Sequence, residues 1–205
     1  MARVTATATS SRRLLLFAGL ALVAALAIAG CGGGAGTAPS SRNAASAPFA
    51  WLAPGSPPAG WTIGRLPSGR ASFAYPPGWR SIHTDPGTFS AALRDGDGRI
   101  RGYLNATPEQ GPETLANWAR FRPDHNKDEG DFDVVTEASA RGLQFRTGSG
   151  SCVMDRYATS RAHYREIACL VHGSRANTVL VGAALPGDWA RLGPQLERSI
   201  SSLAT

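Results

Sequence analysis

The chain has 205 residues, 18% of which are charged, and it contains 24 glycines and 14 prolines. This composition excludes a coiled coil and a highly charged disordered chain. Arg3, Arg12 and Arg13 precede the first apolar segment, and without them the 21 basic residues fall to 18 against 15 acidic ones, a net charge of +3. No basic run remains beyond this segment, so we expect no nucleic-acid partner.

Residues 1–30 have the organisation of an export signal. The basic start ends at Ser11-Arg12-Arg13, and the segment Leu14–Gly30 that follows carries no charge. This apolar run is shorter than the about 20 residues of a spanning helix, and it ends in small residues before a polar stretch. The pattern predicts a signal peptide that is removed. Paired arginines occur in both general and twin-arginine signals, so the export route stays open.

The end of this segment is more specific. Ile28-Ala29-Gly30-Cys31 resembles the lipobox of bacterial lipoproteins, which is an aliphatic residue, two small residues and a cysteine. The resemblance implies that the Cys31 sulfur receives a diacylglyceryl group and that Cys31 becomes the first mature residue. Acyl chains such as palmitate would then hold the lipoprotein at the outer, extracytoplasmic face of the cell membrane, because two or three chains anchor stably. The alternative is an incidental cysteine after an ordinary signal.

Residues 31–57 are rich in Gly, Ala, Ser and Pro and show no sustained periodicity, which predicts a flexible linker. Phe49, Trp51 and Leu52 interrupt it. These side chains either dock on the domain or a partner, or belong to a slightly apolar linker. The composition changes after this stretch, and residues 58–205 are expected to form one domain.

Alternating apolar and polar residues predict most of the strands in this domain. Two Asp-Gly pairs at Asp95–Gly98 indicate a hairpin. The segment Thr178–Leu185 is continuously apolar, which is typical of a central strand. The expected strands are Arg70–Tyr75, Arg80–His83, Thr88–Arg94, Arg99–Asn105, Phe132–Glu137, Gly142–Thr147, Cys152–Ala158, Ala162–His172 and Thr178–Leu185.

Two helices are expected. Pro112 opens the first, near residues 112–122, and Pro123 closes it. Apolar residues at helical spacing predict the second near residues 188–203, with Pro194 at its start or at a kink. The element order predicts the α+β class, a mostly antiparallel sheet of about six to eight strands with the helices on one face.

The exported location makes a disulfide plausible between Cys152 and Cys169. If Ser160-Arg161 forms a two-residue hairpin loop, the two cysteines lie opposite each other at a non-hydrogen-bonded pair. Their Cα atoms then approach to about 4.5 Å, within the range that a disulfide accepts.

The same register has a cost. It places Arg156 opposite Arg165 and Asp155 opposite Glu166, and like charges across a strand pair are unfavourable. A slip of one residue would relieve these pairs but separate the cysteines. We favour the disulfide register, and two buried free thiols are the alternative.

No motif of a known catalytic or metal site occurs in the chain. There is no HExxH, GxSxG, P-loop, GxGxxG or CxxC sequence. The acidic residues between Asp124 and Glu137 do not have the spacing of a calcium loop. We therefore expect no metal and no cofactor, and we interpret the histidines as surface or structural residues. They are His83, His125, His163 and His172.

One motif suggests a fold. The strand end and turn Tyr75-Pro76-Pro77-Gly78-Trp79, the meandering strands after it and a final helix containing Leu196–Ser202 resemble the PsbP-like fold. Actinobacterial lipoproteins of the LpqN type are similar to it. The resemblance implies a non-catalytic accessory or binding domain and transfers no catalytic residue.

These patterns predict a lipid-anchored, extracytoplasmic binding or accessory protein of the cell envelope. Its ligand surface is expected near Trp79 and Tyr103, for an envelope protein or a small molecule. An alternative is an envelope hydrolase, which would require His83 or His163 near a carboxylate in a cleft. Another is a structural envelope protein held to partners through Phe49–Leu52.

Overall fold

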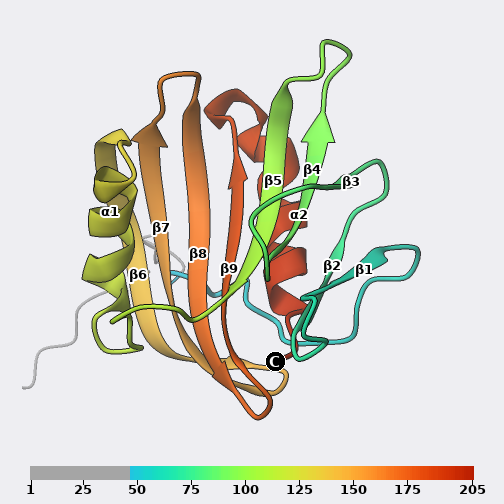
Figure 1. Ribbon diagram of the computed structural model, residues 1–205, viewed down its shortest axis with the longest axis vertical. Helices are drawn as coiled ribbons and strands as arrows, with labels where there is room; N and C mark the ends of the chain where they lie inside the picture. The colour runs from blue at the N-terminus through green and yellow to red at the C-terminus, as the bar shows by residue number, and fades with distance from the viewer. Residues whose placement is uncertain (1–46) are drawn as a thin grey trace, which may run out of the picture. The chain divides into compact units, whose positions relative to one another are not determined.

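The computed structural model describes residues 47–205. The predicted signal peptide, Cys31 and the first part of the predicted linker lie outside the described residues. One antiparallel sheet of seven strands dominates the fold, with a helix on each of its faces and a two-stranded sheet beside it (Figure 1). The α+β class and the expected number of strands are confirmed.

The chain forms nine strands and two α-helices between residues 62 and 201. Strands β1 (Thr62–Arg65) and β2 (Ser72–Tyr75) make the small sheet. The large sheet has the order β3-β4-β5-β9-β8-β7-β6, so β9 is a central strand, as predicted. Its strands are β3 (Arg80–Ile82), β4 (Phe89–Arg94), β5 (Ile100–Pro108), β6 (Phe132–Phe145), β7 (Gly148–Ala158), β8 (His163–Gly173) and β9 (Asn177–Ala184). The helices are α1 (Trp118–Asp128) and α2 (Trp189–Ser201), the latter preceded by the short turn η1 (Pro186–Asp188).

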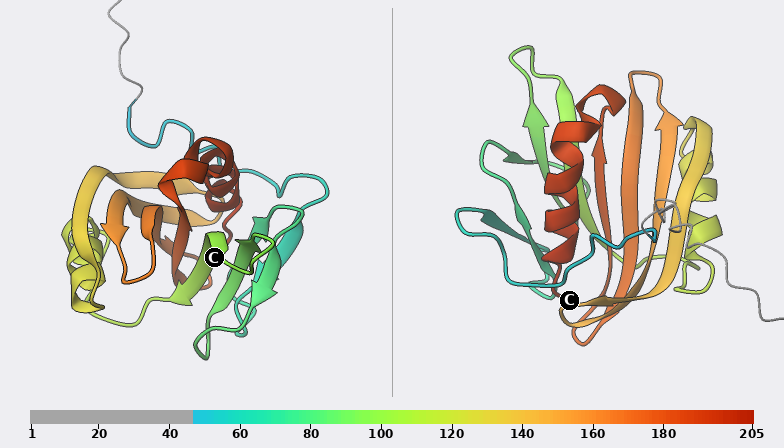
Figure 2. Two further views of the ribbon diagram at one scale, coloured as in Figure 1. Left: turned by 90° about the horizontal axis from the view of Figure 1, so that it is seen from above. Right: turned by 180° about the vertical axis from the view of Figure 1, so that it is seen from behind.

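The helices cover opposite faces of the sheet, so the expectation that both lie on one face is wrong. Alternate residues of the central strands are apolar on both sides, and each side needs a cover. On one face Leu192, Leu196 and Ile200 of α2 pack in the main core. On the other face, Trp118 of α1 packs with Val181 in a second, smaller core. Figures 1 and 2 show the two helices on opposite sides of the sheet.

Helix α1 begins and ends later in the chain than predicted. Thr114 and Asn117 form a turn before the helix, since the Thr114 amide donates to Asn117 Oδ1 (2.7 Å) and the Asn117 amide donates to Thr114 Oγ1 (3.1 Å). Pro123 lies inside the helix and does not end it. It removes one backbone hydrogen bond in the middle of the helix, and the contacts of Trp118 and Arg122 with the sheet compensate for the loss.

Strand β6 replaces the two shorter strands predicted at its ends. Its pairing with β7 is interrupted at three places, including the stretch between Ala140 and Leu143. Gly142 there has a φ of 70°, which a residue with a side chain rarely adopts. Gly142, expected at the start of the second strand, instead permits a bulge within one continuous strand.

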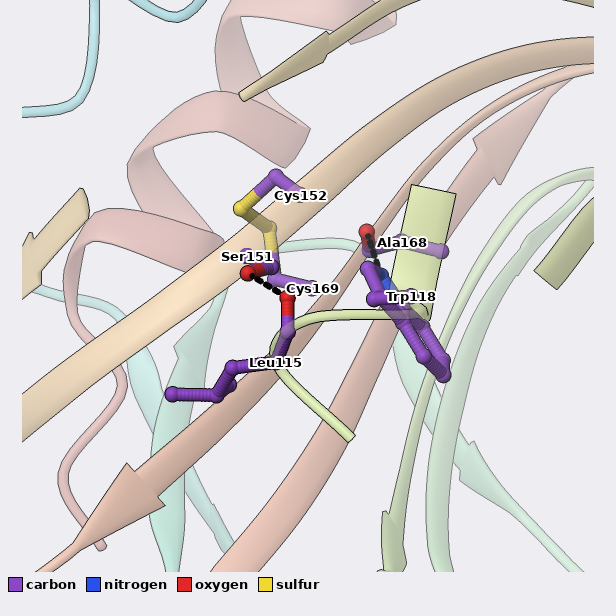
Figure 3. Close-up of a disulfide and its surroundings, with 6 residues drawn as sticks. All are labelled: Leu115, Trp118, Ser151, Cys152, Ala168 and Cys169. Atoms are coloured by element: carbon purple, nitrogen blue, oxygen red, sulfur yellow. Dashed lines mark hydrogen bonds between the residues drawn. A yellow bond between two sulfur atoms is a disulfide. The ribbon is translucent and has the colours of Figure 1, made fainter. Parts of the chain in front are cut away.

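The cysteines form the expected disulfide. Strands β7 and β8 pair in the predicted register, with Cys152 opposite Cys169 and a Cα–Cα distance of 4.1 Å. The like-charged arginine pair is neutralised from β6, because Glu137 binds both Arg156 (2.7 Å) and Arg165 (2.6 Å). Figure 3 shows the disulfide beside the contacts that attach the start of α1 to the sheet.

The last part of the predicted linker is packed against the domain. Phe49 is only 4% exposed and belongs to the main core, together with the partly buried Trp51. The amides of Ala53 and Gly55 donate to the hydroxyl and the carbonyl oxygen of Ser201 in α2, each at 3.3 Å. Of the alternatives for the apolar residues in this stretch, docking on the domain is the one observed, on the α2 side of the sheet (Figure 2).

Candidate functional site

A cavity of about 800 Å³ lies on the sheet face that α2 does not cover. Its sides are α1, the segment 108–113 that leads toward α1, and the segment after β3. Strands β5 and β9 form its floor, with Val179 and Val181 as apolar floor residues. Its volume is within the range that takes small-molecule ligands.

A chain of hydrogen bonds fixes the polar side of this cavity. Thr107 Oγ1 donates to Asn105 Oδ1 (2.7 Å), and Asn105 Nδ2 donates to Ser90 Oγ (2.7 Å). The Ser90 hydroxyl continues to Thr84 Oγ1 (3.2 Å), which is 2.8 Å from Thr88 Oγ1. Because Asn105 and Thr107 are two positions apart on β5, they lie on the same face of the sheet. The polar groups are therefore held in place before any ligand binds.

Aromatic rings form the opposite side. Trp118, Phe121 and His125 follow each other at helical spacing along α1 and stack, with ring centroids 6.0 Å and 5.6 Å apart. The Trp118 indole N–H donates to the Ala168 carbonyl on β8 at 2.9 Å, and this bond fixes the start of the helix on the sheet. His125 Nε2 lies 3.3 Å from Glu129 Oε1, and both residues line the cavity.

A buried ion pair holds the middle of α1 on the sheet. Arg122 Nε and Nη2 bind the two carboxylate oxygens of Glu166 on β8 at 2.7 and 2.9 Å. The Glu166 side chain is fully buried. Burial lowers the pKa of the Arg122 guanidinium, but the Glu166 carboxylate more than offsets this and raises it above its ordinary value. Arg122 is thus a charged residue in the side of the cavity whose charge is already neutralised.

A second carboxylate in the same interface has no such partner. Asp155 on β7 lies directly opposite Glu166, is 0% exposed, and neither of its oxygens has a hydrogen-bond partner of good geometry in the described part of the chain. Burial raises its pKa to about 6, and the negative charge of Glu166 acts in the same direction. Thr136, which faces it from β6, and Arg122 act against this shift. Arg122 therefore pairs with one of two buried acids and acts on the other only through its charge.

Tyrosines connect the cavity to this interface. Tyr103, which lines the cavity, has its hydroxyl 2.7 Å from that of the buried Tyr157. Tyr164 packs edge-on against Tyr103 at a centroid distance of 5.8 Å. Burial raises the pKa of both hydrogen-bonded tyrosines, so they stay neutral near neutral pH.

The structure separates the two residues named for the ligand surface. Tyr103 lines the cavity, whereas Trp79 is 2% exposed and packs in the core on the α2 face. Among residues 47–205, neither His83 nor His163 hydrogen-bonds to a carboxylate, and no three His, Cys, Asp or Glu side chains are grouped to hold a metal ion. The proposed lipidation site Cys31 lies outside the described residues.

Sequence reasoning did not identify Arg122 or Asp155 as site residues. The sequence did contain one indication. The strand register that pairs the two cysteines places Asp155 opposite Glu166, and this pair of like charges had no explanation. Two buried acids facing each other call for a cation from another element, and Arg122 lies 44 positions from Glu166 in sequence. Which arginine supplies this positive charge depends on how α1 lies on the sheet.

No known protein family matches the chain, and no curated protein matches its sequence. The structure is similar to the solution structure of cyanobacterial PsbP (CyanoP) from Synechocystis sp. PCC 6803, with a TM-score of 0.53, 14% identity, and coverage of 71% of this chain and 92% of that chain. It is more distantly similar to LpqN of Mycobacterium tuberculosis, described as involved in cell envelope biogenesis, with a TM-score of 0.35, 16% identity, and coverage of 70% and 83%. At this identity the likeness to CyanoP shows the fold alone, and it confirms the predicted PsbP-like fold. Within residues 47–205 no helix is long and apolar enough to cross a membrane.

Proposed function

We propose that the chain is a lipid-anchored, extracytoplasmic accessory protein of the cell envelope that binds a small molecule in the cavity beside α1. The observation that carries the binding role is the cavity itself, which combines an apolar floor with a polar side whose groups are already oriented. Such a combination is typical of small-molecule sites.

The anchor rests on the sequence. Ile28-Ala29-Gly30-Cys31 matches the lipobox at four adjacent positions, directly after an uncharged apolar segment. The disulfide between Cys152 and Cys169 supports an oxidising location, because such bonds form and persist outside the reducing cytosol.

The side chains that line the cavity favour a ligand that has an apolar part and hydrogen-bond donors and carries no strong negative charge. Arg122 is occupied by Glu166, and His125 is paired with Glu129. The remaining polar side presents hydroxyl and amide groups together with the carboxylates of Asp85 and Glu113. Glu113 Oε2 is buried without a partner among the described residues, so it can accept a hydrogen bond from a ligand.

Native mass spectrometry of the protein extracted from its own membranes tests the binding role. We expect a bound small molecule on the wild-type chain and its loss in Thr107→Trp, because the larger side chain fills the cavity. Thr62→Trp is the matched control, since Thr62 is exposed on β1 and does not line the cavity. Equal occupancy of wild type, Thr107→Trp and Thr62→Trp, or none on any of them, would exclude this cavity as the binding site.

Cell fractionation tests the anchor. The wild-type chain is expected in the membrane fraction and the Cys31→Ala variant outside it. Unchanged partitioning of Cys31→Ala would contradict the anchor and leave the binding role to be judged by the first experiment.

A further inference from the structure

The two ends of α1 are attached to the sheet in different ways. At its start, the Trp118 indole binds the Ala168 carbonyl, and the Ser151 hydroxyl donates to the Leu115 carbonyl at 2.7 Å (Figure 3). Toward its end, Asn126 is fully buried, yet neither its amide nitrogen nor its amide oxygen has a partner among the described residues. Buried polar groups without partners are unfavourable, and water would satisfy them if this end of the helix lifted. The start of α1 is therefore firmly held and its end is not.

The backbone after α1 is suited to a hinge. Gly130 has a φ of 95° and Asp133 has a φ of 54°, a conformation that a residue with a side chain seldom adopts. The pairing of β6 with β7 is interrupted between Phe132 and Val135, so this stretch lacks a continuous ladder of hydrogen bonds. Phe132 is 51% exposed. Asp133 and Val134 therefore have no ladder partner on β7, which lowers the resistance of this connection to movement.

The charges beneath α1 are unbalanced. Glu166 on β8, Thr136 on β6 and Arg122 on α1 surround Asp155. Glu137, next along β6, binds Arg156 and Arg165 and acts on Asp155 only through its charge. Asp131, just after the helix, has a pKa raised by burial and by the neighbouring Glu129 and Glu166. His125 is directed to Glu129 and the cavity. A buried charge is tolerated only when it is paired, and Arg122 is already used by Glu166.

We propose that the end of α1 and the residues up to Val135 form a flap that is closed when Asp155 is protonated and opens when Asp155 is ionised, widening the cavity that His125 and Glu129 line. This inference rests on the proposed function, because it regulates access to the same cavity. Opening exposes the ionised carboxylate and Asn126 to water, and the Trp118 attachment stays in place.

The size of the effect follows from the acidity of Asp155. Its pKa is about 6 under the closed helix and near the ordinary value of 3.8 once exposed. Opening is then expected to become roughly tenfold more favourable between about pH 5 and about pH 7.5. Hydrogen exchange measures this opening, as protection relative to the exchange rate of an unstructured chain at each pH.

The experiment is hydrogen exchange with mass spectrometry on the full, disulfide-bonded chain at both pH values. In wild type, protection of residues 124–133 is expected to fall roughly tenfold at the higher pH, whereas β8 and β9 keep theirs. In Asp155→Asn the protection is expected to be the same at both pH values. Asp124→Asn removes an exposed carboxylate from the same helix and is expected to behave as wild type.

Three outcomes would overturn the flap. The first is equal protection of residues 124–133 in wild type at both pH values. The second is a wild-type pH response in Asp155→Asn. The third is a parallel loss of protection in β8 and β9, which would mean that the whole domain opens. Because the measurement uses ligand-free protein, it tests the flap independently of whether the cavity binds a small molecule.

Discussion

Asp155 and Glu166 lie directly opposite each other on β7 and β8, both fully buried beneath α1, and only Glu166 is paired with an arginine. Like charges on directly opposed strand positions are normally unfavourable, and burial increases the cost. This cost raises the pKa of Asp155, which therefore binds a proton more tightly in the folded chain than in the unfolded one.

This relationship predicts a pH-dependent stability. The pKa of Asp155 is raised in the folded state from 3.8 to about 6, so its contribution to folding is fully present below about pH 4 and is lost as the pH rises through about 6. At about pH 7.5, Asp155→Asn is expected to be more stable than wild type by on the order of 2 kcal/mol, and near pH 4 the two should be alike. Urea unfolding at both pH values measures the difference. A variant that is less stable by the same amount at both pH values would contradict the assignment.

Removing the positive charge of Arg122 is expected to lower the stability. Arg122→Met leaves Glu166 buried without a cation, which is expected to cost about 3–5 kcal/mol of unfolding free energy. Adding Glu166→Gln to Arg122→Met should recover part of this loss, because a neutral amide is less costly to bury. Urea unfolding of the two single variants and the double variant gives the coupling energy. Additive losses would show that the two side chains do not interact.

The disulfide is expected to add stability without determining the fold. Replacing Cys152 and Cys169 together by alanine opens a covalent loop with a sequence separation of 17 and should cost about 3 kcal/mol at neutral pH. The β7–β8 register should survive, because Glu137 still binds Arg156 and Arg165 across the adjacent strands. Unfolding of the variant, compared with wild type under reducing conditions, measures the cost. Amide-to-amide contacts between β7 and β8 by NMR check the register, and a one-residue slip there would contradict this prediction.

The docked segment should contribute to stability as well. Phe49→Ala removes a nearly fully buried ring from the main core and is expected to cost about 3–5 kcal/mol. The matched control is Phe132→Ala, in which the lost ring is about half exposed and should cost well under half as much. Thermal unfolding compares them. Equal, small losses would mean that residues 47–57 do not pack against α2 in solution.

The parts of the fold that sequence predicted are those in which one local rule applies. The hairpin of β7 and β8 followed from a two-residue loop and two cysteines, and its register was right to the residue. The continuous apolar run of β9 indicated a central strand, and the Asp-Gly pairs gave the turn between β4 and β5.

The parts that sequence missed depend on contacts between distant elements. Pro123 predicted the end of α1. The helix continues past this residue because Trp118 and Arg122 pack on the sheet. The composition predicted a linker up to residue 57, but Phe49 packs in a core that is complete only once α2 has folded. The cavity and the buried acids beneath α1 likewise arise only when α1 lies on the sheet, against β6 and β7.

The docked segment also decides on which side the chain enters the domain. Residues 47–57 run along the α2 side, and the cavity lies on the other side of the sheet. The docked segment and the cavity are therefore separated by the sheet, and the mouth of the cavity is not obstructed by residues 47–57.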